Sequence, residues 1–136
     1  MFYQGVCGFS TQVWRNALIN PYLETTHRQN HGNWWKAYYG DEIVGDDAAI
    51  YEMDKQLEFR NGSDYPIYMR TLEVNGNKYL LSVVPKQADQ IVEIRREQIG
   101  KLKGRVIRTI INKKTSKQID REYYVSQYKG VVSGSN

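Results

Sequence analysis

Two segments joined by Asn75-Gly76-Asn77 are the feature that most constrains the fold of this chain. Residues 67–72 alternate in character from one position to the next, and residues 79–84 are rich in Leu and Val. Alternation with a period of two is typical of a β-strand that has one face in the core. An Asn-Gly pair between two such segments is typical of a tight hairpin turn. The sequence therefore predicts an antiparallel strand pair here.

Further strand candidates surround this hairpin and are short. They are Trp34–Tyr39, an aromatic run, then Asp47–Tyr51, Gln56–Arg60, Ile91–Arg95, Arg105–Ile111 and Arg121–Val125. We expect a polar connection over Tyr22–Asn33, a break at Pro85–Gln90 and a loose tail over Val131–Asn136. One early helix followed by many strands predicts an α+β fold, with the helix packed on a mostly antiparallel sheet and a C-terminal strand extension.

That helix is predicted to run from Cys7–Ser10 to about Asn20. Apolar residues recur on one face at Phe9, Val13, Trp14, Ala17 and Leu18. Ser and Thr at positions 10 and 11 suit a helix start, and Pro21 cannot continue the helix. We therefore expect the only cysteine of the chain at the positive end of a helix dipole, flanked by glycines.

Composition excludes several classes of protein. A single Cys cannot form an internal disulfide, and no Cys/His group has zinc spacing, so we expect no cofactor or metal. No apolar run approaches the roughly 20 residues of a membrane span, and no signal peptide follows Met1. Residues 1–60 carry a net charge of −3 and residues 61–136 one of +7. The basic half could meet an anionic polymer, but it has no nucleic-acid motif, and its Lys and Arg alternate with apolar residues as on the wet faces of strands.

Cys7 is the candidate nucleophile. A thiolate is favoured at a helix N-terminus, and a nucleophilic Cys needs a base and commonly a third group that orients this base. His31 and Asp47 follow in chain order and could take these roles, as in thiol sites of the transglutaminase-like or papain-like kind. On residue chemistry alone His27 and Asp46 are available as well, and Cys7 could simply be a small buried side chain.

The order and spacing of several motifs resemble one family. The motifs are Gly5-Val6-Cys7, Ser10-Thr11, Ala17-Leu18, Asn30-His31, Tyr38-Tyr39, residues 45–50 (Gly-Asp-Asp-Ala-Ala-Ile), residues 57–61 (Leu-Glu-Phe-Arg-Asn) and Pro66-Ile67-Tyr68. Over about residues 4–84 they resemble the VanW family, which is named from an accessory gene of vancomycin-resistance clusters. The resemblance implies a bacterial cell-envelope or extracellular protein with a link to peptidoglycan; the biochemical role of the family is not established.

Carried over residue by residue, the family pattern falls on Cys7, Ser10, Thr11, His31, Asp47 and Asn61. It favours His31 over His27 and Asp47 over Asp46. The chain departs from the pattern at Tyr3-Gln4, where the family has a Gly-rich approach, and at Gly8, where the family has Gln. The resemblance implies a VanW-like unit over 1–85 that lacks the N-terminal part of the family domain, a basic extension over 86–130 and a tail over 131–136.

Two functions are consistent with these residues. One is an accessory or binding module that contacts peptidoglycan or another wall polymer through Trp34, Trp35, Tyr38, Tyr39 and Asn61. The other is a cysteine-dependent amidase, peptidase or transpeptidase that acts on peptidoglycan peptides. In that enzyme Cys7 would attack a carbonyl, His31 would be the base, Asp47 would orient His31, and the start of the helix at Gly8, Phe9, Ser10 and Thr11 would support the oxyanion.

Overall fold

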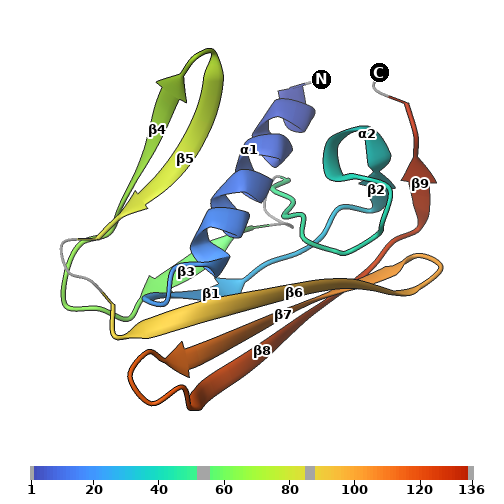
Figure 1. The fold of residues 1–136 in the computed structure, drawn as a ribbon. Helices are drawn as coiled ribbons and strands as arrows, with labels where there is room; N and C mark the ends of the chain where they lie inside the picture. The colour runs from blue at the N-terminus through green and yellow to red at the C-terminus, as the bar shows by residue number, and fades with distance from the viewer. Residues whose placement is uncertain (1, 52–55, 85–87, 135–136) are drawn as a thin grey trace.

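The computed structural model describes residues 2–51, 56–84 and 88–134, with side chains from Gly8 onward. It is an α+β fold in which one long helix lies among several small sheets (Figure 1). The elements are α1 (Phe2–Leu18), β1 (Leu23–His27), β2 (Asn33–Trp35), α2 (Lys36–Tyr39), β3 (Glu58–Asn61), β4 (Tyr68–Val74), β5 (Asn77–Val83), β6 (Gln90–Gly100), β7 (Lys103–Asn112), β8 (Gln118–Gln127) and β9 (Gly130–Val132).

The strands form four separate sheets in the described part of the chain. Three are antiparallel, β1–β3, β4–β5 and β6–β7–β8, and β2 pairs in parallel with β9. The α+β class is thus confirmed, but α1 packs among small sheets and not on one continuous sheet. The predicted hairpin is also confirmed: Asn75 and Gly76 have positive φ, as a tight turn between β4 and β5 requires.

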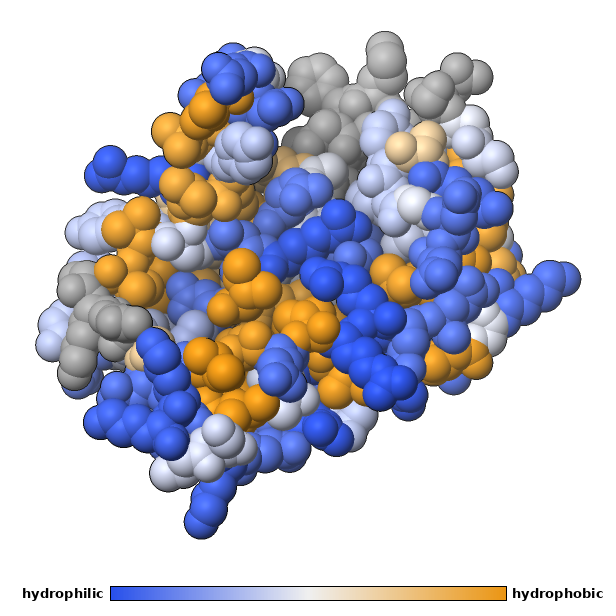
Figure 2. Space-filling model, viewed as in Figure 1, coloured by the Kyte–Doolittle hydropathy of each residue, from blue (hydrophilic) through white to orange (hydrophobic). Residues whose placement is uncertain are grey.

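The hairpin β4–β5 carries its large exposed apolar side chains on the face turned away from α1. Asn16 of α1 binds the carbonyl of Leu80 and the hydroxyl of Ser82, so this face of β5 lies toward the helix. Figure 2 shows apolar side chains exposed on the hairpin, and the large exposed ones are Tyr68, Leu72, Val74, Tyr79, Leu81 and Val83.

One core joins the helix to the C-terminal sheet. Trp14 and Leu18 of α1, Ala48 and Val106 of β7 form a buried cluster. Arg108, which lies on the same face of β7 as Val106 and is 2% exposed, donates to the carbonyls of residues 18, 20 and 23 just where α1 ends. The C-terminal carbonyls of a helix lack partners within the helix, and this buried guanidinium provides one for the carbonyl of Leu18, the last residue of α1.

A second core cluster holds the turn that follows α2. It contains Trp34, Ile43 and Tyr128, and Trp34 donates its indole N–H to the carbonyl of Gly40. Gly104 lies against this turn so closely that a Cβ would meet the carbonyl oxygen of Ile43 at 2.4 Å. Only glycine therefore fits at position 104 with the present backbone.

Several element predictions were wrong. Helix α1 begins at Phe2 and not at Cys7–Ser10, and Phe9 is 59% exposed. The buried stripe of α1 instead includes polar residues, because Ser10 and Thr11 bind the carbonyl of Ala48. The strand predicted over 34–39 ends at Trp35 and continues as α2, where rings of this segment pack on one another.

Other corrections concern which segments find a pairing partner. The segment predicted as a strand over 47–51 forms no regular strand, because its polar groups bond to α1 and to Gln29. The predicted connection 22–33 contains strand β1, and the predicted tail contributes β9. The three C-terminal strands are confirmed but longer than predicted. The strand predicted over Gln56–Arg60 is also confirmed, with its bounds shifted to Glu58–Asn61. Half of the predicted break at Pro85–Gln90, residues 85–87, lies outside the described residues, and Gln90 begins β6.

Candidate functional site

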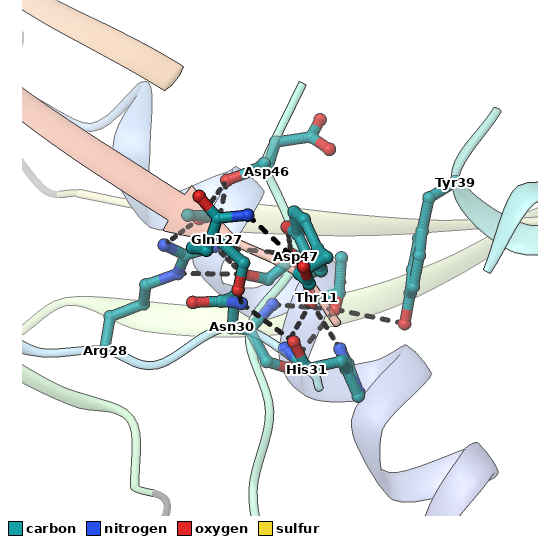
Figure 3. A network of polar contacts seen from close by, with 12 residues as sticks. Thr11, Arg28, Asn30, His31, Tyr39, Asp46, Asp47 and Gln127 are labelled. Carbon is teal, nitrogen blue, oxygen red and sulfur yellow. Dashed lines mark hydrogen bonds and ion pairs between the residues drawn. The ribbon is translucent and has the colours of Figure 1, made fainter. Parts of the chain in front are cut away.

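Asp47 is the centre of a buried polar network beside α1 (Figure 3). Its carboxylate side chain has no solvent exposure. One oxygen, Oδ2, accepts the backbone N–H of His31 at 2.7 Å and contacts Nδ1 of the His31 ring. The other oxygen, Oδ1, accepts the hydroxyl of Tyr128 and lies 3.4 Å from the guanidinium of Arg28. The carboxylate thus holds both the main chain and the ring of His31.

The surroundings keep Asp47 ionised. Burial alone would raise the pKa of Asp47, but the hydrogen bond from His31, the charge of Arg28 and the hydroxyl of Tyr128 outweigh it and hold this pKa below its usual value. Burial, reinforced by the neighbouring carboxylate, raises the pKa of Tyr128 well above its usual value. Tyr128 therefore remains a protonated donor at neutral pH.

Arg28 anchors the network to three other segments. Its side chain is 4% exposed, donates to the carbonyls of Gly45 and Asp47 and to the hydroxyl of Ser126, and lies 4.2 Å from the centre of the Trp14 ring. Burial lowers the pKa of Arg28, and the charge of Asp47 opposes this effect. Among the described residues, every buried side-chain nitrogen or oxygen has a hydrogen-bond partner, so the network is saturated and its geometry is well defined.

Because Asp47 engages Nδ1, Nε2 is the nitrogen of His31 that is left for other chemistry. A carboxylate at Nδ1 favours the tautomer with the proton on Nδ1, which leaves a lone pair on Nε2. The His31 side chain is 15% exposed, and its ring lies 5.8 Å from the Tyr39 ring. The Tyr39 hydroxyl in turn lies 3.5 Å from Oγ1 of Thr11 on α1. His31 is thus an oriented imidazole close to the helix.

Helix α1 meets this network at Ser10 and Thr11. Both hydroxyls donate to the carbonyl of Ala48, and Thr11 also accepts the N–H of Ala48. The backbone of Cys7 lies in α1, three and four residues before these two, and residues at this spacing share a helix face. The side chain of Cys7 lies outside the described part of the structure, so the predicted pairing of Cys7 with His31 stays a prediction.

The structure distinguishes Asp46 and His27, which residue chemistry left as alternatives, from Asp47 and His31. The carboxylate of Asp46 points away from that of Asp47 and pairs with Arg15 and Arg96 (Figure 3). His27 lies in β1, opposite Glu58. The structure therefore brings His31 and Asp47 together, whereas Asp46 pairs with two arginines.

The predicted oxyanion residues lie inside α1. N–H groups in the interior of an α-helix bond to the carbonyl four residues earlier. An oxyanion role for Gly8, Phe9, Ser10 or Thr11 would therefore require the first turns of α1 to open. The hydroxyls of Ser10 and Thr11 hold the loop at Ala48.

The predicted binding residues do not form one surface. Trp34 is fully buried, whereas Tyr38 is 53% exposed and its ring lies 6.2 Å from that of the partly exposed Trp35. Asn61 binds the carbonyl of Tyr65 and caps a local turn at Ser63, away from the network.

Arg28 and Tyr128 are site residues that sequence reasoning missed. They are 19 and 81 positions away from Asp47 in the sequence, so no local sequence pattern indicates these contacts. The signal that was present is indirect: an ionised carboxylate that is buried must have a cationic or hydrogen-bonding partner.

Two further observations concern the described residues. They contain no cluster of three or more His, Cys, Asp or Glu side chains with which to hold a metal ion. None of their helices combines the length and the apolar character that crossing a membrane takes.

The part of the chain that matches a family model contains most of the residues of this site. The model of the family described as VanW like protein matches residues 4–84, more than half of the chain, and this range includes Cys7, Arg28, His31 and Asp47. No curated protein and no solved structure matches the chain. On the strength of the family match, the chain belongs to the VanW-like protein family.

Proposed function

We propose that this VanW-like chain is a cysteine-dependent acyl-transfer enzyme of the bacterial cell envelope, an amidase, peptidase or transpeptidase that acts on the peptides of peptidoglycan. The observation that supports the proposal is that the Asp47 carboxylate binds both the backbone N–H and ring Nδ1 of His31. A fully buried carboxylate that fixes the tautomer and orientation of an imidazole is the arrangement that a general base requires.

In the proposed reaction, Nε2 of His31 takes the proton of the Cys7 thiol. The thiolate attacks a peptide carbonyl, and the protonated His31 returns the proton to the leaving amine. A thioester remains on Cys7, and water or a second amine then releases it. Ionised Asp47 stabilises the imidazolium that forms between these steps.

The position of Cys7 in the chain supports this role. Ser10 and Thr11 contact the loop that follows Asp47, and Cys7 lies one helical turn before them on the same face of α1. Helix α1 begins at Phe2, so the thiol would depend on His31 for activation and not on the end of the helix dipole. Oxyanion support from Gly8, Phe9, Ser10 and Thr11 is a part of the proposal that requires the first turns of α1 to open.

The test is digestion of purified peptidoglycan, followed by mass spectrometry of the released muropeptides. We expect new cleaved or cross-linked stem peptides with the wild-type protein and none with Cys7→Ala or His31→Ala. His27→Ala is the matched control, since this histidine lies in β1 opposite Glu58, and it should retain activity. Identical muropeptides with wild-type and Cys7→Ala protein would refute the proposed cysteine-dependent activity.

The second candidate function is an accessory module that binds the cell wall without catalysis. The observation in its favour is the pair of rings at Trp35 and Tyr38, of which Tyr38 is half exposed. Exposed aromatic rings bind sugar faces through apolar contact. Co-sedimentation with purified sacculi tests this function: Trp35→Ala and Tyr38→Ala should weaken binding, whereas Tyr65→Ala, which removes another exposed tyrosine, should not.

A further inference from the structure

The polar network extends beyond the family match at residues 4–84. Tyr128, between β8 and β9, is 2% exposed and donates its hydroxyl to Oδ1 of Asp47. Its ring packs edge-on against Trp34 at 5.4 Å, and its backbone N–H donates to the carbonyl of Leu102 at 2.8 Å. The ring contact with Trp34 and the backbone hydrogen bond to Leu102 therefore fix the position of the Tyr128 hydroxyl.

The two oxygens of Asp47 have different partners, and this difference sets the direction of the carboxylate. Oδ2 binds His31 through both the backbone N–H and ring Nδ1. Oδ1 binds to Tyr128 and lies at the longer distance of 3.4 Å from Arg28. Without the Tyr128 hydroxyl, Oδ1 would have Arg28 as its remaining polar partner, and a turn of the carboxylate toward Arg28 would draw Oδ2 away from His31.

Other groups of the same C-terminal segment hold the loop that carries His31. Asn30 donates to the carbonyl of Gln127 at 3.0 Å, and the backbone N–H of Lys129 donates to the carbonyl of Gly32 at 2.8 Å. Directly after this loop, β2 pairs with β9. Residues on both sides of His31 are thus bonded to the segment that contains Tyr128.

We infer that Tyr128 is a positioning residue for the His31–Asp47 pair, and that residues 126–132, beyond the family match, complete the site in this chain. Tyr128 holds Oδ1 so that Oδ2 faces His31, and the segment around it holds the His31 loop in register. The inference rests on the proposed function only for the consequence at Cys7. The effect on the His31 ring is independent of catalysis.

The test compares Tyr128→Phe with Tyr124→Phe in the full chain. Both substitutions remove one tyrosine hydroxyl, but Tyr124 lies in β8, where its hydroxyl binds Glu122 outside the Asp47 network. The ¹⁵N shifts of the His31 ring report which nitrogen carries the proton. We expect the tautomer with the proton on Nδ1 to predominate in the wild type and in Tyr124→Phe, and mixed tautomers in Tyr128→Phe.

The rate of Cys7 alkylation links the same variants to function. If the proposed function holds, we expect Tyr128→Phe to lower this rate at neutral pH about tenfold, the scale of one hydrogen bond to a charged group, and Tyr124→Phe to leave it unchanged. A changed tautomer with an unreactive wild-type thiol would support the positioning role and refute the proposed function. An unchanged tautomer in folded Tyr128→Phe would overturn the inference.

A measurement on the wild-type protein covers the case in which Tyr128→Phe does not fold. The Tyr128 hydroxyl proton is buried and bonded to a carboxylate, so its NMR signal should be protected from exchange with solvent. A Tyr128 hydroxyl proton that exchanges as fast as that of exposed Tyr65 would contradict the inference.

Discussion

Replacing Asp47 by Asn tests how strongly the buried network depends on a negative charge. The substitution keeps the shape of the side chain but leaves Arg28, whose side chain is 4% exposed, without a charged partner. Removal of one partner of a buried ion pair costs about 3–5 kcal/mol. Because Asn retains one acceptor oxygen for His31 or Tyr128, we expect a loss near the lower end, about 3 kcal/mol of unfolding free energy at pH 7.

Asp46→Asn is the matched control because it makes the same chemical change one residue earlier. The arginines that pair with Asp46, Arg15 and Arg96, have side chains 23% and 37% exposed, so water can replace the lost carboxylate. We therefore expect a loss of about 1 kcal/mol. Urea unfolding measures both losses through the fluorescence of Trp14 and Trp34, which are fully buried in the native state.

The dependence on pH checks the origin of the loss. The pKa of Asp47 is lowered in the folded state, so its contribution to stability is complete above the ordinary carboxyl pKa of about 3.9 and is lost as the pH falls through the folded value. The gap between wild type and Asp47→Asn should therefore shrink as the pH falls below about 4, because protonation of Asp47 then removes the same charge as the substitution. Equal losses for the two variants, or a gap that persists in acid, would refute the reasoning.

Two further substitutions test the packing that positions the site. Arg108→Met removes the buried donor to the carbonyls of Leu18 at the end of α1 and of residues 20 and 23 after it, so we expect a loss of about 3 kcal/mol in urea unfolding. The more exposed Arg105→Met should cost less than about 1 kcal/mol, and equal losses would contradict the role of Arg108 at the end of the helix. Gly104→Ala places a Cβ 2.4 Å from the carbonyl oxygen of Ile43, so we expect its melting temperature to fall by several degrees or more, whereas Gly32→Ala, with no atom within 4 Å of the new Cβ, should stay close to wild type.

The sequence predicted the parts of the fold that depend on local patterns. The β4–β5 hairpin follows from alternation on both sides of an Asn-Gly turn, and the C-terminal strands follow from Lys and Arg that alternate with apolar residues. Prediction from the sequence failed where tertiary contacts determine the secondary structure. The aromatic run over 34–39 predicted a strand, but the chain turns into α2 at Lys36. The rings of Tyr38 and Tyr39 there pack against Trp34, Trp35 and one another.

The site was predictable to a similar extent. Residue chemistry left His27 and His31, and Asp46 and Asp47, as open alternatives, and the resemblance to the family favoured His31 and Asp47, which the structure places in contact. The roles of Arg28 and Tyr128 could not be predicted, because their bonds to Asp47 exist only once α1, the His31 loop and the C-terminal segment have packed together.

The most direct test of the central claim is the pH dependence of Cys7 alkylation in wild-type and His31→Ala protein. If an imidazole oriented by Asp47 takes the thiol proton, the wild-type rate should persist well below the ordinary thiol pKa of about 8.5, and His31→Ala should return the profile to that value. Profiles that follow an ordinary thiol in both proteins would contradict the account.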